Sequence, residues 1–282
     1  KVTGGSTAIN GSTFLRGLPE DYDSWTESGN DQWSFQKLLP FLNKIETDTT
    51  YQSSPGDFHG ADGPIICHRF LEPQWLLGSK AFVEACMSDG HEYCEDANAP
   101  GTTGVGPMPL NNPDGIRWST SLGYLSISRT RLNLTIRANV SAKRIVFSQV
   151  GEKTTATGVE VVSGGETFVV EGDEIIMSAG AIASPQLLML SGIGPKQHLE
   201  SHGIECLIDA PGVGQNLRDH PLLGLKWVTK PEVDLDPLGP SGQVMLRYTA
   251  EGSSIENDMI VYMGARTSKR RDDGGKRGDP IG

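Results

Sequence analysis

The sequence lacks a long apolar run, since no stretch approaches the roughly 18 consecutive apolar residues that a membrane-spanning helix needs. Cysteine is also scarce, with 4 residues in 282. This number excludes a scaffold held together by many disulfides and favours reduced thiols, as in the cytoplasm. No charged and apolar leader opens the chain, but its first residue is Lys1, so export stays open. We expect a chain without a membrane span.

Positive charge is in short supply. The chain has 24 Lys and Arg residues against 35 Asp and Glu residues, which gives a formal net charge of -11. A nucleic-acid partner would require a basic face, so the composition argues against such a partner. The basic residues between 269 and 277 are interrupted by Asp272 and Asp273, a pattern that is typical of a solvated loop.

Hydrophobic residues make up 37% of the chain, which is enough for a sizeable core in one large domain or two smaller ones. Apolar residues at helical spacing, or Pro and Gly at the ends of a segment, predict three helices. They are residues 33–45, interrupted by Pro40, residues 79–89, with Ala81, Phe82, Ala85 and Cys86 on one face, and residues 195–203.

Alternating apolar and polar residues predict strands in two regions. The first is a meander of residues 132–137, 140–147, 158–162 and 167–170, with turns at Gly151 and at Gly164 and Gly165. The second comprises residues 224–229, 243–250 and 258–263, and a short strand is also expected at residues 204–208.

Residues 173–195 are the stretch around which we interpret the rest of the chain. Ile175, Ile176 and Met177 predict a short buried strand, and small residues follow it. Ser184 and Pro185 predict the start of a helix, because serine accepts hydrogen bonds from first-turn amides and proline has no amide to leave unpaired. A strand, a bare turn and a helix N-terminus bind phosphate groups in many α/β proteins. The same order of elements is also an ordinary connection.

Residues 180–194 resemble the second signature of the glucose-methanol-choline oxidoreductases, a family of flavoenzymes that hold FAD and oxidise alcohols. The matching positions are Gly180, Ala181, Ser184, Pro185, Leu187, Leu188, Ser191, Gly192, Ile193 and Gly194. The start of the chain resembles most of the first signature through Gly4, Gly5, Ser6, Thr7, Ile9, Asn10 and Phe14, with Thr3 at a position that is usually aliphatic. Residues 18–25, 57–65, 117–119 and 212–221 resemble further segments of the family.

The resemblance implies an α/β (α+β) fold class. We expect an FAD-binding, Rossmann-like domain with a β-meander excursion at residues 1–221, without its N-terminal βαβ unit. Residues 222–282 would begin an antiparallel-sheet substrate domain, so both domains would be incomplete.

The resemblance also implies the cofactor and the residues that hold it. FAD should be bound noncovalently, because Asn10 follows Ile9 and not a histidine. The first signature would lie beside the flavin ring and ribityl chain, Val140 would contact the adenine end through its backbone, and Ala179 and Gly180 would line the nearby turn. The implied cofactor-binding residues are Ser6, Asn10, Gly11, Ser12, Thr13, Val140, Ala179 and Gly180.

The implied reaction transfers a hydride from a primary or secondary alcohol to flavin N5 while a base accepts the hydroxyl proton. The family's catalytic histidine lies downstream of this chain, and its Gly-x-Gly-x-x-Gly turn lies upstream. We therefore interpret the chain as the middle of such an enzyme, without a catalytic residue of its own. The alcohol and the electron acceptor are not identified by the sequence.

Two alternatives to an alcohol oxidoreductase stay open. One is a family member that keeps FAD structurally and cleaves cyanohydrins as a lyase. The other is a fragment that folds incompletely, binds nothing and purifies without yellow colour.

Other motifs are interpreted as structural. Cys86, His91 and Cys94 resemble a zinc site, but the fourth ligand is missing, and we expect no metal. His59 lies on a glycine-rich loop, and a structural role is favoured for it and for His220. Residues 212–217 imitate a dinucleotide fingerprint, but a leucine occupies the position of the third glycine.

Overall fold

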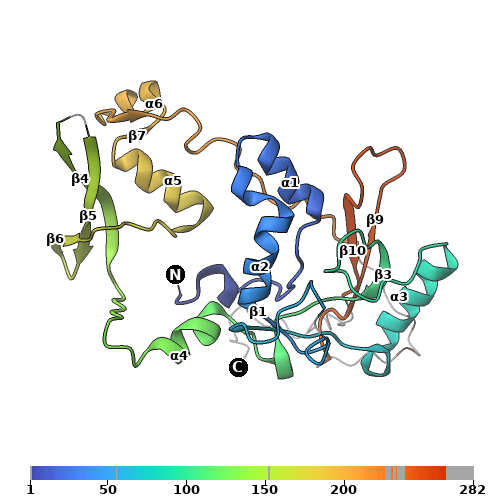
Figure 1. Cartoon of the computed structure of the whole chain (residues 1–282). Helices are drawn as coiled ribbons and strands as arrows, with labels where there is room; N and C mark the ends of the chain where they lie inside the picture. Colours follow the sequence, from blue (N-terminus) through green and yellow to red (C-terminus); the bar gives the residue numbers. More distant parts are fainter. Residues whose placement is uncertain are drawn as a thin grey trace. The chain divides into compact units, whose positions relative to one another are not determined.

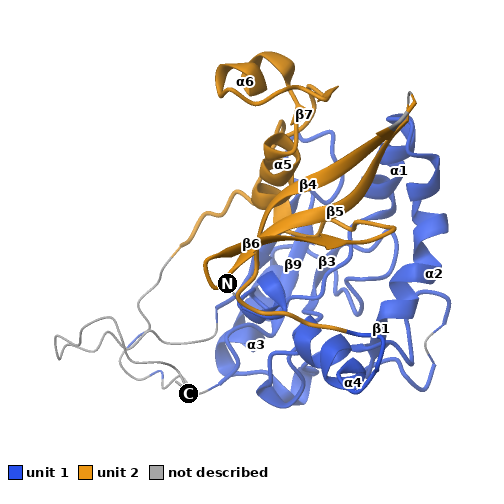
Figure 2. Cartoon of the chain, turned by 90° about the vertical axis from the view of Figure 1, so that its left-hand side faces the viewer, with its two compact units in different colours: residues 1–134, 228–282 blue, residues 135–227 orange. Residues whose placement is uncertain are grey.

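A computed structural model describes residues 2–54, 56–151, 153–225, 230, 233 and 239–264. The chain, drawn in Figure 1, forms two compact units. Unit 1 comprises residues 1–134 and 228–282, and unit 2 comprises residues 135–227; Figure 2 shows them in blue and orange. This division does not test the domain boundary predicted after residue 221, which stays a prediction.

Unit 1 contains most of the helices. Its longer helices are α1 (Pro19–Glu27), α2 (Phe35–Ile45) and α3 (Leu77–Ser88), and α4 (Ser126–Ser128) is a single turn. Other single turns are η1 (Gly5–Ala8), η2 (Asp31–Trp33), η3 (Glu72–Gln74), η4 (Pro113–Gly115) and the π-helical η5 (Ser121–Leu125). No helix in the described part of the chain is both long and apolar enough to cross a membrane.

Two of these helices were predicted from the sequence. α2 confirms the helix expected at residues 33–45, and it continues through Pro40 instead of ending there. α3 confirms the helix at residues 79–89, and the predicted buried face was correct in part. Cys86 is buried and Phe82 packs against the core, whereas Ala81 and Ala85 are exposed. The buried stripe instead runs through Ser79, Val83 and Cys86, at i, i+4 and i+7.

Two small sheets complete unit 1. β1 (Glu46–Asp48) pairs in parallel with β2 (Ile65–Cys67). β3 (Gly104–Pro107), β9 (Val244–Tyr248) and β10 (Met259–Tyr262) form an antiparallel sheet in the order β10-β9-β3. β9 and β10 confirm the strands predicted at 243–250 and 258–263. Residues 224–225 are not in a strand, and the rest of the strand predicted at 224–229 lies outside the described residues.

The core of unit 1 surrounds β9. Successive side chains of a strand point to opposite faces, and both faces of β9 are buried. Val244 and Leu246 belong to a cluster with Trp75, Val83, Cys86 and Val105. Met245 belongs to a second cluster, with Cys94, Ala97, Met108 and Leu110. Residues far apart in sequence are therefore held together by one strand.

Unit 2 is built on an antiparallel meander of β4 (Ser141–Val150), β5 (Lys153–Ser163) and β6 (Glu166–Glu171). β5 and β6 pair up to Ser163 and Glu166, and the two residues between them, Gly164 and Gly165, have φ of 60° and 88°. This conformation is the one a tight hairpin requires. The predicted meander is confirmed from residue 141 onward, but residues 132–137 form no strand.

The rest of unit 2 follows the meander. It comprises α5 (Gly180–Leu190), β7 (Ile193–Gly194), α6 (Lys196–Ser201) and β8 (Ile208–Asp209), with β7 and β8 paired in parallel. α6 confirms the helix predicted at residues 195–203, and β8 lies at the end of the strand predicted at 204–208.

The organising stretch differs from its prediction in two ways. Residues 173–177 form no strand, and Ile176 is 80% exposed. A strand requires a neighbour for its backbone hydrogen bonds, and no described strand pairs with this stretch. α5 begins at Gly180 and not at Ser184, so Pro185 lies inside the helix. Ser184 Oγ still binds at the helix start, where it accepts a hydrogen bond from Ala179 N at 3.1 Å.

Candidate functional site

The first predicted flavin segment, residues 4–13, folds as η1 followed by a turn at residues 10–12. Gly4 and Gly5 have φ of 94° and 56°, which glycine adopts without steric cost. The backbone oxygen of Ser6 accepts hydrogen bonds from the amides of Ile9 and Asn10, at 3.0 and 2.8 Å. Of the five residues implied here, Ser6, Asn10, Gly11 and Thr13 are exposed, as residues that contact a ligand must be.

One guanidinium fixes the turn that follows. Arg117 Nη1 donates to the backbone oxygen of Asn10, to Asn10 Oδ1 at 2.8 Å and to Ser12 Oγ at 3.0 Å. Asn10 Oδ1 also accepts from Ser12 N at 3.1 Å, which closes an Asx turn. Ser12 is 5% exposed and has φ of 59°, which is uncommon for a residue other than glycine. Its hydroxyl therefore supports the turn from inside.

The segment rests on residues that follow β3. Ser12 O accepts a hydrogen bond from Asn111 N at 2.8 Å, and Phe14 N donates to Pro109 O at 2.9 Å. Thr120 N donates to Thr7 Oγ1 at 3.0 Å. Sequence reasoning did not identify Arg117 or Thr120 as supports. The only signal for Arg117 was that residues 117–119 resemble a family segment, which assigns no partner, and Thr120 had no signal.

The other three implied residues lie in unit 2. Val140 is half-buried and directly precedes β4, whereas Ala179 and Gly180 are exposed at the start of α5. β4 is tied to α5 by a hydrogen bond of 2.8 Å from Ile145 N to Ser191 Oγ. Asn10 and Ala179 belong to different units, so a groove shared by the two signatures stays a prediction.

Both signature segments expose backbone that is free of bulky side chains. A Cβ placed at Gly5 or Gly180 would meet no atom within 4 Å, and at Gly11 it would meet only Thr13 Oγ1, at 3.9 Å. The first amides of α5 have no acceptor within the helix and carry its partial positive charge. Bare backbone suits a flat ring, and free helix amides suit a phosphate. The residues present therefore fit a flavin nucleotide.

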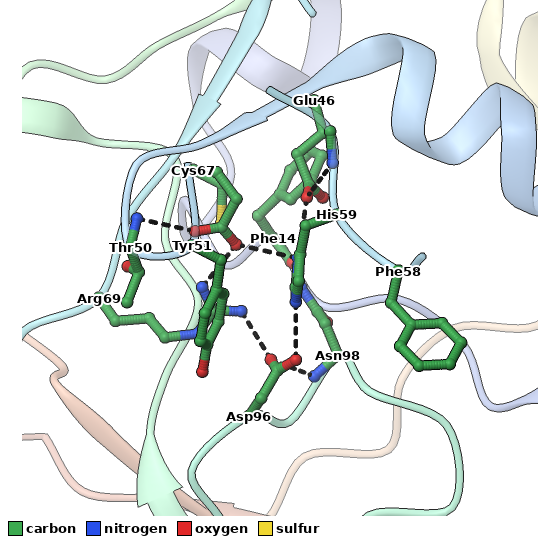
Figure 3. Close-up of polar contacts among 12 residues, drawn as sticks. Phe14, Glu46, Thr50, Tyr51, Phe58, His59, Cys67, Arg69, Asp96 and Asn98 are labelled. Atoms are coloured by element: carbon green, nitrogen blue, oxygen red, sulfur yellow. Dashed lines mark hydrogen bonds and ion pairs between the residues drawn. The ribbon is translucent and has the colours of Figure 1, made fainter. Parts of the chain in front are cut away.

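A second polar assembly in unit 1, which we call the His59 cluster, was not predicted (Figure 3). His59 Nδ1 lies 3.1 Å from Glu46 Oε1 and 3.3 Å from Asp48 Oδ2, and Nε2 lies 2.8 Å from Asp96 Oδ2. Arg16 pairs with Glu46 at 2.7 Å. Arg69 pairs with Asp48 at 2.6 Å and with Asp96 at 2.8 Å. The cluster consists of Arg16, Glu46, Asp48, His59, Arg69 and Asp96.

The geometry requires His59 to carry a positive charge. Both ring nitrogens face carboxylates, and a neutral imidazole has only one N–H to donate. Burial by itself would lower the pKa of His59, but hydrogen bonds to Asp48, Asp96 and Glu46 outweigh it and raise the pKa to about 10. Tyr51 covers the cluster, with its ring centroid 4.5 Å from that of His59 and 4.8 Å from Arg69 Cζ.

The charges of the His59 cluster balance. Three carboxylates face three cations, so the sum is zero. Glu46, Asp48 and His59 lie close enough together to serve as metal ligands. A divalent cation there would have to displace two guanidinium groups and the His59 proton from the carboxylates. The displaced guanidinium groups would then be buried without partners, which costs free energy. We therefore interpret the cluster as an ion network that fixes the fold, in agreement with the structural role expected for His59.

The pH dependence of stability tests this interpretation. The raised pKa of His59 means that its contribution is complete below its ordinary pKa of 6.5 and is lost as the pH rises through about 10. The free energy of unfolding should therefore fall across this range, and the difference between the wild type and His59→Gln should shrink with it. Urea unfolding at a series of pH values measures both. A difference that stays constant from pH 6.5 to 10 contradicts a protonated His59.

The remaining candidate residues do not form a site. Among the described residues, Cys86, His91 and Cys94 are not one of the groups close enough to bind a metal. His91 instead lies edge-on to Tyr248, with ring centroids 5.4 Å apart. His220 is fully exposed and lies 3.7 Å from Asp219, so unit 2 does not show the packing role expected for it.

Comparisons with known proteins agree with the sequence signatures. The model of the GMC oxidoreductase family matches residues 1–222. The chain is 38% identical over 221 residues to an uncharacterised GMC-type oxidoreductase of Rhodococcus erythropolis, covering 78% of this chain and 43% of that protein. It is 39% identical over 221 residues to an oxygen-dependent choline dehydrogenase of Photobacterium profundum, covering 78% of this chain and 38% of that protein.

Solved structures show the same relationship. Pyridoxine 4-oxidase from Mesorbium loti matches with a TM-score of 0.77 at 28% identity, covering 92% of this chain and 50% of that one. An FAD-dependent oxidoreductase from Chaetomium thermophilum matches with a TM-score of 0.66 at 30% identity, covering 75% of this chain and 38% of that one. The chain thus spans about two fifths of the length of its curated relatives.

Proposed function

The chain belongs to the GMC oxidoreductase family, and we propose that it forms flavin-binding parts of an enzyme that oxidises the CH–OH group of a small alcohol. The family match and the FAD-dependent relative identify FAD as the cofactor. The relatives named as choline dehydrogenases support an alcohol as the substrate class. The observation that carries the proposal is the bare, exposed turn at residues 4–13, which Arg117 holds in place.

The residues of this chain would bind and orient the cofactor. Ser6, Asn10, Gly11 and Thr13 would lie along the flavin ring and ribityl chain, with Ser12 holding the turn from behind. Val140, Ala179 and Gly180 would hold the adenine end. When bound, FAD supplies the acceptor for the hydride of the alcohol. We assign the proton-accepting base to no residue of this chain, because none of the described histidines lies beside these segments in a hydrogen-bonded position.

The test is anaerobic mixing of the natural protein that carries this chain, loaded with FAD, with choline and with simple primary and secondary alcohols. We expect at least one alcohol to bleach the visible flavin absorbance, because the hydride reduces the ring. The same mixture without alcohol is the control. If every alcohol leaves the flavin oxidised while a cyanohydrin is cleaved, the lyase alternative is correct. If the protein takes up no FAD, the proposal is wrong.

A further inference from the structure

We propose that Arg117 is a positioning residue for FAD, which acts by holding residues 10–12 in the conformation that receives the flavin. The inference rests on the proposed function, since it assumes that residues 4–13 contact the cofactor. It assigns a role to a residue that lies more than a hundred positions away from that segment in the sequence.

The first argument is the convergence of contacts on one nitrogen. Arg117 Nη1 donates to Asn10 O, to Asn10 Oδ1 at 2.8 Å and to Ser12 Oγ at 3.0 Å. All three acceptors belong to the same turn, and the two N–H groups of Nη1 are shared among them. The bonds are charge-assisted, hence stronger than neutral ones. No other described side chain bonds to both Asn10 and Ser12.

The second argument is the conformation that these bonds maintain. Ser12 has φ of 59°, and left-handed backbone costs free energy for a residue with a side chain. Asn10 Oδ1 offsets part of the cost by accepting from Ser12 N at 3.1 Å. Arg117 binds the same Oδ1, so it keeps the asparagine in the rotamer that closes the turn. Without the cation, both the turn and the direction of the exposed Gly11 backbone would be less well defined.

The third argument is that some hydrogen-bond donors of the Arg117 guanidinium have no acceptor within the fold. The guanidinium is half-buried, and Arg117 Nε and Nη2 have no acceptor in the described part of the chain. Partial exposure distinguishes Arg117 from Arg69 of the His59 cluster, whose side chain is fully buried between two carboxylates, although Arg69 Nε also has no acceptor among the described residues. A cation with unused donors beside a segment that exposes its backbone suits an electron-rich, oxygen-bearing ligand such as a flavin nucleotide.

These observations predict how affinity depends on Arg117. If only a fraction of the molecules hold the turn in the binding conformation, the apparent dissociation constant rises by the inverse of that fraction. We expect Arg117→Met to raise the dissociation constant of FAD roughly tenfold or more. Because the three contacts meet at one nitrogen, Arg117→Lys should restore much of the affinity. Arg144→Met is the matched control, because Arg144 is exposed and its one ion pair among the described residues is with Glu160, at 2.9 Å.

The experiment is a fluorescence titration of the natural apoprotein that carries this chain with FAD, for the wild type and the three variants. Hydrogen exchange without FAD provides a second readout. The amides of residues 10–12 should exchange faster in Arg117→Met, and those of β9 should not change. If Arg117→Met does not fold, Ser12→Ala carries the test, since it removes one of the three acceptors and should raise the dissociation constant severalfold.

The outcomes separate the two proposals. A weaker affinity in Arg117→Met that Arg117→Lys restores, with Arg144→Met unchanged, supports the inference. Equal affinity in the wild type and Arg117→Met overturns it and leaves the proposed function intact. An equal loss in Arg117→Met and Arg117→Lys also overturns it, because the contacts require only one donating nitrogen. A wild-type protein that binds no FAD overturns the proposed function instead.

Discussion

Replacing Arg69 by methionine is expected to lower the free energy of unfolding by about 3–5 kcal/mol, as the loss of one partner from a buried ion pair does. The Arg69 side chain is fully buried and lies 2.6 Å from Asp48 and 2.8 Å from Asp96. Methionine fills much of the same volume but leaves the buried Asp48 carboxylate and the half-buried Asp96 carboxylate without that cation. Urea unfolding of the natural protein that carries this chain measures the loss.

Two further variants make this result specific. Arg144→Met removes an exposed arginine, and surface pairs contribute about 1 kcal/mol or less, so its stability should be close to that of the wild type. Asp48→Asn combined with Arg69→Met should recover part of the loss, because it removes one of the uncompensated charges. If Arg69→Met is no more destabilising than Arg144→Met, the His59 cluster does not hold unit 1 together.

Replacing Gly60 by alanine should be the second large effect, a loss of about 3 kcal/mol at the upper end of the usual range for overpacking. A Cβ at this position would lie 2.0 Å from the backbone oxygen of Asn43 and 2.2 Å from that of Glu46. Backbone atoms cannot rotate away as a side chain can. A displacement of the Gly60 backbone would also move the neighbouring His59 away from its carboxylate partners. Thermal and urea unfolding measure the loss.

Gly212→Ala is the matched control for Gly60→Ala. Neither glycine has a left-handed φ, and a Cβ at Gly212 would meet no atom within 4 Å. Its substitution should change the free energy of unfolding by no more than about 0.5 kcal/mol. Equal effects of the two substitutions would show that the close approach at Gly60 relaxes without cost.

The two polar assemblies of unit 1 have different chemistry. The His59 cluster is buried and neutral overall, and its members are paired with one another, so it serves the fold. Arg117 is half-buried and has donors that the fold leaves unused, so it can serve a ligand. Arg69 and Arg117 differ in their burial and in their partners, and neither property can be read from the sequence.

Several local features were correctly predicted from the sequence because short-range rules decide them. The pair Gly164–Gly165 permits a hairpin turn that most residues cannot adopt, and the alternation around it places β5 and β6. The periodicity of residues 35–45 likewise predicted α2. The family and its cofactor were also correctly inferred, because the glycine-rich signatures are contiguous in the sequence.

The wrong predictions share a physical cause. Ile175, Ile176 and Met177 have the composition of a buried strand, but a strand forms only when another backbone pairs with it. The strand predicted at residues 132–137 is absent for the same reason. Ser184 and Pro185 have the chemistry of a helix start, yet α5 begins at Gly180, because Ser184 can bind Ala179 N from within the first turns.

The sequence by itself determined the family, the cofactor and the positions of the two signature segments, since each depends on residues that are neighbours along the chain. Only the tertiary structure decided that Arg117 holds Asn10 and Ser12, and that His59 is surrounded by three carboxylates. These contacts join residues separated by 11 to 107 positions. No spacing rule links such residues, because folding of the chain, and not its local conformation, brings these donors and acceptors together.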